Sequence, residues 1–210
     1  MAAKRKNINP RIERKITRIS GVREVKQTFL IICEGVNTEP DYFNAFRLTS
    51  ANVKAIGQGM GTLALVQKAI NIKEQEKLKG RTYNQNWVVF DKDDFPENDF
   101  NSAILLAQQN GFEVAYSNQA FEFWFLLHFN LYQGALHRSK YEKMLSTLLG
   151  FAYTKKSDVS SKMFNVLFTK QEQAINHAKT IMKQFDGNNP AQHESSTTVH
   201  LLVKELNRFL

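Results

Sequence analysis

Two short apolar stretches that each end in acidic residues constrain the fold of this chain more than any other feature. Residues 29–33 form an unbroken apolar run followed by Glu34, and residues 87–90 form a second run followed by Asp91 and Asp93. Unbroken apolar runs of this length are typical of strands that are buried on both faces of a parallel sheet. The carboxyl ends of such strands share one edge of the sheet, where binding and catalytic groups gather in open α/β folds. The sequence therefore predicts an α/β protein with an acidic sheet edge.

The rest of the chain alternates strand-like and helix-like segments. Two further strands are predicted at residues 52–56 and 112–116. Helices are predicted at residues 41–48, 63–81, 99–109, 121–129, 141–149, 161–184 and 197–209. Thr38 is expected to cap the first of these helices, and Ser117 with Asn118 to cap the fourth. The expected fold is an α/β domain with about four mainly parallel strands, flanked by helices, with a helical C-terminal part.

Positive charge is concentrated at the N-terminus. The chain has a formal net charge of +8, and residues 1–26 hold nine Lys or Arg side chains against two Glu, a net charge of +7. Such an arm is typical of proteins that contact phosphates or acidic protein surfaces, although a disordered solubilising tail has the same composition. We expect a flexible arm over residues 1–26 and a single α/β domain over residues 27–210, with its helical extension from about residue 138. The candidate nucleic-acid contacts are Lys4, Arg5, Lys6, Arg11, Arg14, Lys15, Arg18 and Lys92.

The composition argues against several classes of protein. Cys33 is the only cysteine and lies inside the first apolar run, so neither an internal disulfide nor a thiolate metal cluster is expected. No apolar run approaches the roughly 20 residues that span a bilayer, and the basic N-terminus lacks the apolar segment of a secretory signal. We therefore expect a cytoplasmic protein that does not associate with membranes.

The acidic residues that follow the two apolar runs form a candidate metal site. Glu34 and the pair Asp91 and Asp93 are expected at the same sheet edge, and in an extended backbone the two aspartates point the same way. Clustered carboxylates repel one another unless a cation or a proton neutralises them. Mg²⁺ or Mn²⁺ bound there, with phosphate oxygens completing the shell, would suit phosphodiester chemistry. The alternative is that these are exposed acids at helix N-termini, where the helix dipole favours them.

Glu122 is a further candidate because it is the only acid in the apolar segment 121–129. A buried, unpaired carboxylate is costly, so Glu122 is expected to meet a metal, a cation or a donor such as Asn118 or His128. Glu39 and Asp94 are secondary candidates for completing the shell. His128 by itself is more typical of a core or orienting histidine than of a metal ligand.

Four motifs give the sequence a family resemblance. They are Cys33-Glu-Gly with Thr38-Glu39, the segment 89–93, the segment 117–129, and Asn189-Pro190 with the segment 196–199. In this order they resemble the RloB-like family, whose core is similar to a Toprim fold. Toprim folds pair a glutamate after the first strand with an Asp-x-Asp after a later strand. Glu34 and the pair Asp91 and Asp93 match those places.

The resemblance implies a Mg²⁺- or Mn²⁺-dependent phosphotransfer site, and a nuclease in particular. Glu34 would act as a general acid or base or share a metal, and Asp91 and Asp93 would hold the metal. The family also implies a role in bacterial phage defence or abortive infection, beside a separate ATPase. Alanine at Asp91 or Asp93 is expected to abolish cleavage with little effect on folding, because edge acids are expected to be exposed.

A non-catalytic subunit that binds nucleic acid or assembles a complex is the alternative function. In that case the basic arm would supply the affinity, and the acids would be relics or helix caps. The sequence leaves open whether the nucleic acid is DNA, RNA or tRNA.

Overall fold

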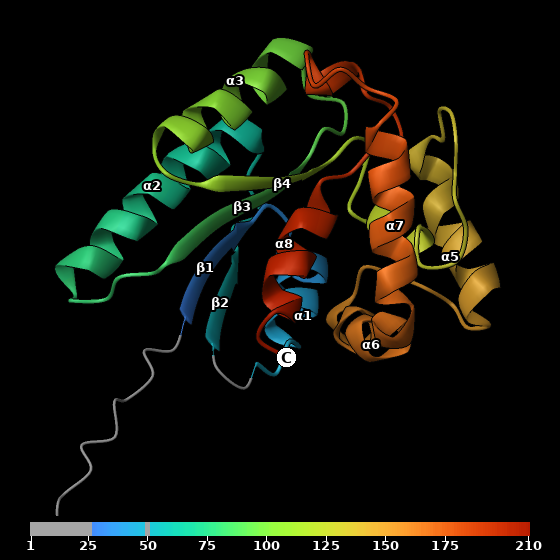
Figure 1. Ribbon diagram of the computed structural model, residues 1–210, viewed down its shortest axis with the longest axis horizontal. Coiled ribbons are helices and arrows are strands. Elements are labelled where there is room, and N and C mark those ends of the chain that lie inside the picture. Colours follow the sequence, from blue (N-terminus) through green and yellow to red (C-terminus); the bar gives the residue numbers. More distant parts are fainter. Residues whose placement is uncertain (1–26, 49–50) are drawn as a thin grey trace, which may run out of the picture.

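The computed structural model describes residues 27–48 and 51–210, and it has an α/β architecture (Figure 1). The strands are β1 (Gln27–Cys33), β2 (Ala51–Gly57), β3 (Gln85–Asp91) and β4 (Glu113–Ser117). They form one sheet in the order β2-β1-β3-β4, and every neighbouring pair is parallel. The prediction of a four-stranded parallel sheet is therefore confirmed.

The helices flank the sheet and make up the C-terminal part of the chain. They are α1 (Thr38–Asn44), α2 (Thr62–Leu78), α3 (Glu97–Gln109), α4 (Glu122–Leu126), α5 (Tyr141–Leu149), α6 (Ser157–Leu167), α7 (Gln171–Met182) and α8 (Val199–Asn207). From residue 138 onward the secondary structure is almost entirely helical, as predicted. Among the helices of the described residues, none combines the length and the apolar character needed to cross a membrane.

Both faces of the sheet are buried, and alternate residues of each strand face opposite sides. In β1, Leu30 and Ile32 pack with α2 and α3, whereas Phe29, Ile31 and Cys33 pack on the side of α1 and the C-terminal helices. Figure 1 shows α2 and α3 on one side of the sheet, and α1 and α8 on the other. Burial on both faces explains why β1 is an unbroken apolar run.

Two predicted helices differ from the observed ones. The segment 161–184 was predicted as one helix, but α6 and α7 are separated by a 3₁₀ turn, Phe168–Lys170. The buried positions keep a helical spacing across this turn, from Leu167 to Gln171, so hydrophobic periodicity carries no signal for the break. The segment 121–129 is buried as expected, but only α4 within it is helical.

The predicted caps are also wrong. Asn37 occupies the N-cap position of α1, and Thr38 is its first helical residue. Ser117 belongs to β4, and the side-chain amide of Asn118 donates to the carbonyls of Pro190 and Ala191 at 3.1 and 2.9 Å. Asn118 thus joins the end of β4 to the C-terminal segment instead of capping a helix.

The outer edge of β4 is covered by residues 196–198. The backbone N–H of Tyr116 donates to Thr198 Oγ1 at 2.9 Å, and the N–H of Thr198 donates to the Tyr116 carbonyl at 2.8 Å. The N–H of Asn118 donates to the Ser196 carbonyl at 2.9 Å. Unpaired strand edges invite association with other chains, so this C-terminal segment satisfies and protects the edge.

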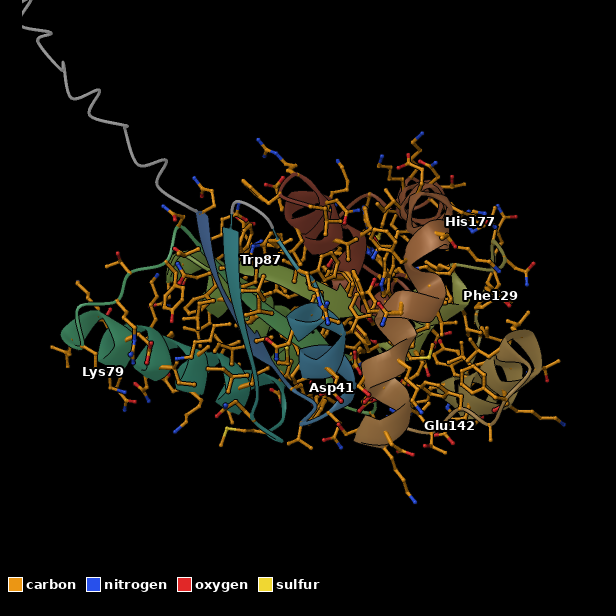
Figure 2. The ribbon with its side chains drawn as sticks, turned by 90° about the horizontal axis from the view of Figure 1, so that it is seen from below. Asp41, Lys79, Trp87, Phe129, Glu142 and His177 are labelled. Atoms are coloured by element: carbon orange, nitrogen blue, oxygen red, sulfur yellow. The ribbon has the colours of Figure 1, made fainter. Side chains whose placement is uncertain are left out.

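The contact between α1 and α6 ties the sheet to the C-terminal helices. Asp41 Oδ2 accepts hydrogen bonds from the hydroxyls of Ser157 and Ser160 at 2.8 and 2.5 Å. Figure 2 shows Asp41 where α1 meets this helical part, far from Lys79 at the end of α2. The C-terminal part is therefore held against the sheet near the start of α1.

Candidate functional site

A cavity of about 270 Å³ lies at the carboxyl edge of the sheet, between the ends of β1 and β3. The chain leaves β1 toward β2 and leaves β3 toward β4, so these two strands flank the point where the strand order reverses. Ligands of open α/β sheets bind in the crevice at such a point. The cavity is lined by five carboxylates and one ammonium group, those of Glu34, Glu39, Asp91, Asp93, Glu122 and Lys155.

Glu34 links the ends of the two central strands. Its backbone N–H donates to the Val89 carbonyl at 2.9 Å, which extends the pairing of β1 with β3 by one residue. Its side-chain Oε2 accepts the backbone N–H of Asp91 at 3.0 Å. The glutamate predicted after the first strand is therefore held against the aspartate predicted after the third.

Glu39 and Gly35 form a compact turn beside Glu34. The N–H of Gly35 donates to Glu39 Oε1 at 3.2 Å, and Glu39 is 5% exposed. A Cβ atom on residue 35 would lie 2.1 Å from Glu39 Oε2, which is far inside van der Waals contact. A side chain at position 35 would therefore displace the Glu39 carboxylate, which occupies that space.

Asp91 is buried, and the expectation that it would be exposed is wrong. It is the last residue of β3, it is 8% exposed, and its Oδ2 accepts the backbone N–H of Phe121 at 3.0 Å. Its Oδ1 is buried and has no hydrogen-bond partner in the part of the chain that the structure describes. A buried carboxylate oxygen without a partner is costly, so this atom is available for a ligand.

Asp93 lies in a turn, and the predicted extended arrangement of Asp91-x-Asp93 is wrong. Its φ is +43°, in the left-handed region, because the chain turns directly after β3. The guanidinium group of Arg138 donates to the carboxylates of both Asp93 and Asp94. Asp93 nevertheless lines the same cavity as Asp91, whereas Asp94 does not.

Glu122 is paired with residues that the sequence analysis did not single out. Its Oε1 accepts the hydroxyl of Tyr153 at 3.0 Å, and its Oε2 lies 3.1 Å from the ammonium of Lys155. The donors expected for Glu122 have other partners. His128 is fully buried, its Nδ1 lies 2.9 Å from the Trp124 carbonyl, and burial lowers its pKa to about 4.

Burial and mutual repulsion keep several of these carboxyl groups protonated at higher pH than usual. Burial raises the pKa of Glu34 to about 7, and the charges of Asp93 and Glu39 act in the same direction. Burial also raises the pKa of Glu39 to about 7, with a further contribution from Glu122. The pKa of Asp91 is raised well above its usual value, first by burial and then by Glu39 and Glu122. The cavity therefore favours a bound cation or bound protons.

Lys155 is the cationic residue that lines this cavity, and its ammonium lies 3.1 Å from Glu122 Oε2. Burial acts to lower the pKa of Lys155, but the charge and hydrogen bond of Glu122, together with the charges of Asp91 and Glu39, raise that pKa above its usual value. The Lys155 side chain is 56% exposed, so its ammonium lies at the rim of the cavity, where a ligand could reach it.

The donor set suits a hard divalent cation, but it is not closed around one. Within residues 27–48 and 51–210, no group of three or more His, Cys, Asp or Glu side chains is arranged to hold a metal ion. The cavity still offers several carboxylate oxygens, among them the buried, unpartnered Oδ1 of Asp91, and these are the ligand type that Mg²⁺ and Mn²⁺ prefer. The residues fit a divalent cation whose shell is completed by water or phosphate oxygens.

The predicted nucleic-acid contacts lie mostly outside the described residues. This applies to Lys4, Arg5, Lys6, Arg11, Arg14, Lys15 and Arg18. Lys92 is described, and its ammonium donates to the Phe95 carbonyl at 2.5 Å within the turn after β3.

Comparison with known proteins places the chain in a family. A family model for RloB-like proteins matches residues 29–206. The chain belongs to the RloB-like family. The matched region of this RloB-like chain contains nearly the whole sheet and every residue that lines the carboxylate cavity. No curated protein matches the sequence.

Proposed function

We propose that this RloB-like protein is a Mg²⁺- or Mn²⁺-dependent endonuclease with a Toprim-like core. The observation that supports this most is the cavity between β1 and β3, in which five carboxylates gather and the Oδ1 of Asp91 has no partner among the described residues. We further propose that it acts in the cytoplasm in bacterial phage defence or abortive infection, beside a separate ATPase, as its family resemblance implies.

Asp91 and Asp93 would hold the metal, Glu34 would either share it or act as a general acid or base, and Glu39 and Glu122 would shape the charge around it. A bound divalent cation would polarise a phosphodiester and lower the pKa of the attacking water. Glu34 is suited to move a proton at neutral pH, because its pKa of about 7 lets it both accept and return one. Lys155 at the rim would offset phosphate charge.

A second candidate function is a non-catalytic subunit that binds nucleic acid or assembles a complex. The ion pairs favour this function, because Lys155 already compensates Glu122 and Arg138 already compensates Asp93. In that case the acids would have a structural role, and binding would depend on basic residues elsewhere.

A cleavage assay separates the two functions. Purified protein is incubated with labelled DNA, RNA and tRNA, with Mg²⁺, Mn²⁺ or EDTA, and Asp91→Asn and Asp93→Asn are tested alongside. Asn is preferred to Ala at residue 91, because its side-chain oxygen can still accept the Phe121 N–H. We expect metal-dependent cleavage that falls by about 100-fold or more in both variants but persists in the exposed control Asp158→Asn. Equal cleavage by wild type and both site variants would contradict the assignment of cleavage to Asp91 and Asp93, and binding without cleavage would favour the second function.

A further inference from the structure

Lys155 belongs to a connecting segment, residues 151–156, that contains neither helix nor strand. This segment joins α5 to α6, and Tyr153 fastens it to the protein. The backbone N–H of Tyr153 donates to Ser146 Oγ of α5 at 2.9 Å. Its buried ring packs edge-on against Phe125, with the ring centroids 6.1 Å apart. The backbone two residues before Lys155 is therefore held in place, although no regular element carries it.

The carboxylate of Glu122 links the side chains of Tyr153 and Lys155. Its Oε1 accepts the Tyr153 hydroxyl at 3.0 Å, and its Oε2 lies 3.1 Å from the Lys155 ammonium. Glu122 and Tyr153 are both buried, whereas the side chain of Lys155 is largely exposed. Hydrogen bonds to ionised groups are among the stronger ones in proteins. Two buried side chains thus hold the ammonium of an otherwise mobile lysine at the rim of the carboxylate cavity.

The Lys155 ammonium can keep this contact and still bind an anion. An ammonium has three N–H donors, and the contact with Glu122 uses one of them. Among the described residues that line the carboxylate cavity, Lys155 alone carries a positive charge. A free lysine loses much rotamer entropy when it binds a ligand, and a lysine that is already held loses less. Lys155 is therefore prepared to donate to a phosphate oxygen that enters this cavity.

We propose that Tyr153 and Glu122 are positioning residues that act through Lys155. The Tyr153 hydroxyl orients the Glu122 carboxylate, and Glu122 holds the Lys155 ammonium. Lys155 in turn donates to a non-bridging oxygen of the substrate phosphodiester at the carboxylate cavity. Glu122 then contributes to substrate binding by fixing a lysine, in addition to its charge near the proposed metal. This inference rests on the proposed nuclease function.

A purely structural role of the Tyr153 hydroxyl would behave differently. If the hydroxyl only stabilises the fold, its loss has the same effect on substrate binding whether or not Lys155 is present. If it acts through Lys155, its loss has no further effect once the Lys155 charge has been removed. A double-mutant cycle on substrate binding therefore separates the two roles.

The cycle is measured by fluorescence anisotropy with a phosphorothioate-linked oligothymidylate, in Mn²⁺ and at constant salt. We expect Lys155→Gln to weaken binding about tenfold and Tyr153→Phe about threefold. The combined variant should bind within about twofold of Lys155→Gln alone. Lys156→Gln, which changes the exposed neighbouring lysine, is the matched control and should weaken binding by less than about twofold. If Lys155→Gln fails to fold, Glu122→Gln/Lys155→Gln replaces it, because that variant leaves no buried charge unpaired.

The affinity of Tyr153→Phe for Mn²⁺, measured from the electron paramagnetic resonance signal of free Mn²⁺, should stay within about twofold of wild type. A larger loss would overturn the inference, because Tyr153 would then support the metal site. The inference is also overturned if Lys155→Gln binds the oligonucleotide normally, or if Tyr153→Phe weakens binding equally with and without the Lys155 charge. In each of these cases metal-dependent cleavage by wild type leaves the proposed function standing. A wild type that neither binds Mn²⁺ nor cleaves nucleic acid overturns both.

Discussion

The carboxyl group of Glu39 shows how a single buried acid affects stability. Its pKa is raised by burial from its usual value of 4.5 to about 7, so the folded state holds a proton that the unfolded state releases between these pH values. The folded state is therefore destabilised as pH rises from about 4.5 to 7, and the full cost is present above pH 7.

Glu39→Gln removes this cost while retaining an oxygen for the Gly35 N–H. We expect it to raise the free energy of unfolding of the metal-free protein by about 1–3 kcal/mol at pH 8, and to change it little at pH 4.5. Urea unfolding followed by circular dichroism at the two pH values measures this, with the exposed Glu74→Gln as control. A variant that is less stable than wild type at pH 8 would show that the cost of burying the Glu39 charge does not dominate at this position.

The same pKa values predict how metal binding depends on pH. A divalent cation needs deprotonated carboxylates, and the pKa of Glu34 and of Glu39 is about 7. Addition of Mn²⁺ at pH 6.5 should therefore release protons from Glu34 and Glu39 that are already lost at pH 8.5, so the release should be smaller at pH 8.5. A pH-stat measures the release directly. Equal proton release at both pH values, or none at either, would contradict the claim that the carboxyl groups of Glu34 and Glu39 lose protons when the cation binds.

Part of the site was predictable from single residues, and part was not. Glu34, Asp91 and Asp93 were predicted because each follows an apolar run that ends at the same sheet edge, and all three line the cavity. Lys155 and Arg138 could not be predicted, because they come from the C-terminal part. Their carboxylate partners lie about 30 to 45 residues earlier, and no local pattern marks such pairs.

At the scale of elements, the loop after β1 packs against the end of β2. A Cβ atom on Gly57 would lie 2.4 Å from the Gly35 carbonyl oxygen and 2.6 Å from the Val36 Cα, and these backbone atoms cannot turn aside. Gly57→Ala should therefore displace the backbone that carries Glu34. We expect a loss of stability of about 1–3 kcal/mol and weaker Mn²⁺ binding.

Thermal unfolding and Mn²⁺ titration measure this effect, and Gly61→Ala is the control. At Gly61 the obstacle is the far end of the Phe95 ring, 2.7 Å away, which can rotate. Normal Mn²⁺ binding by Gly57→Ala would show that the position of Glu34 does not depend on this contact.

The edge of β4 gives a prediction that concerns folding alone. Thr198 is 8% exposed, and its hydroxyl both accepts the Tyr116 N–H and donates to the Val114 carbonyl at 3.3 Å. Thr198→Val removes both bonds and leaves a buried N–H without a partner, at a cost of about 1–3 kcal/mol. Chemical denaturation measures this loss of stability. The control is Thr180→Val at an exposed position, which should lower the free energy of unfolding by less than about 0.5 kcal/mol. Equal costs would show that the edge is not stabilised by this residue.

The order of the elements was more predictable than their ends. All four strands were predicted because burial on both faces gives β1 and β3 short, unbroken apolar runs, β4 is largely apolar, and a glycine-rich turn follows β2. The break between α6 and α7 was not predicted, because the buried residues on its two sides keep the spacing of one continuous helix. The turn at Asp93 was missed for a related reason, since an acidic segment after a strand fits an extended chain and a turn equally well.

At the scale of the whole molecule, the sheet and the C-terminal helices each supply part of the site. The sheet brings Glu34 and Asp91 together where the strand order reverses, and α4 adds Glu122 beside them. The C-terminal part contributes the compensating cations Arg138 and Lys155. The match to the RloB-like family spans both parts, which is consistent with a site that requires both.

The central claim is that the carboxylate cavity binds a divalent cation, and calorimetric titration of Mn²⁺ at pH 8 tests it most directly. We predict one saturable binding event in wild type that is lost in the Asp91→Asn/Asp93→Asn double variant, while the variant keeps its circular dichroism spectrum. Binding of equal affinity and stoichiometry by the folded double variant would contradict the claim, because the cation would then be bound elsewhere.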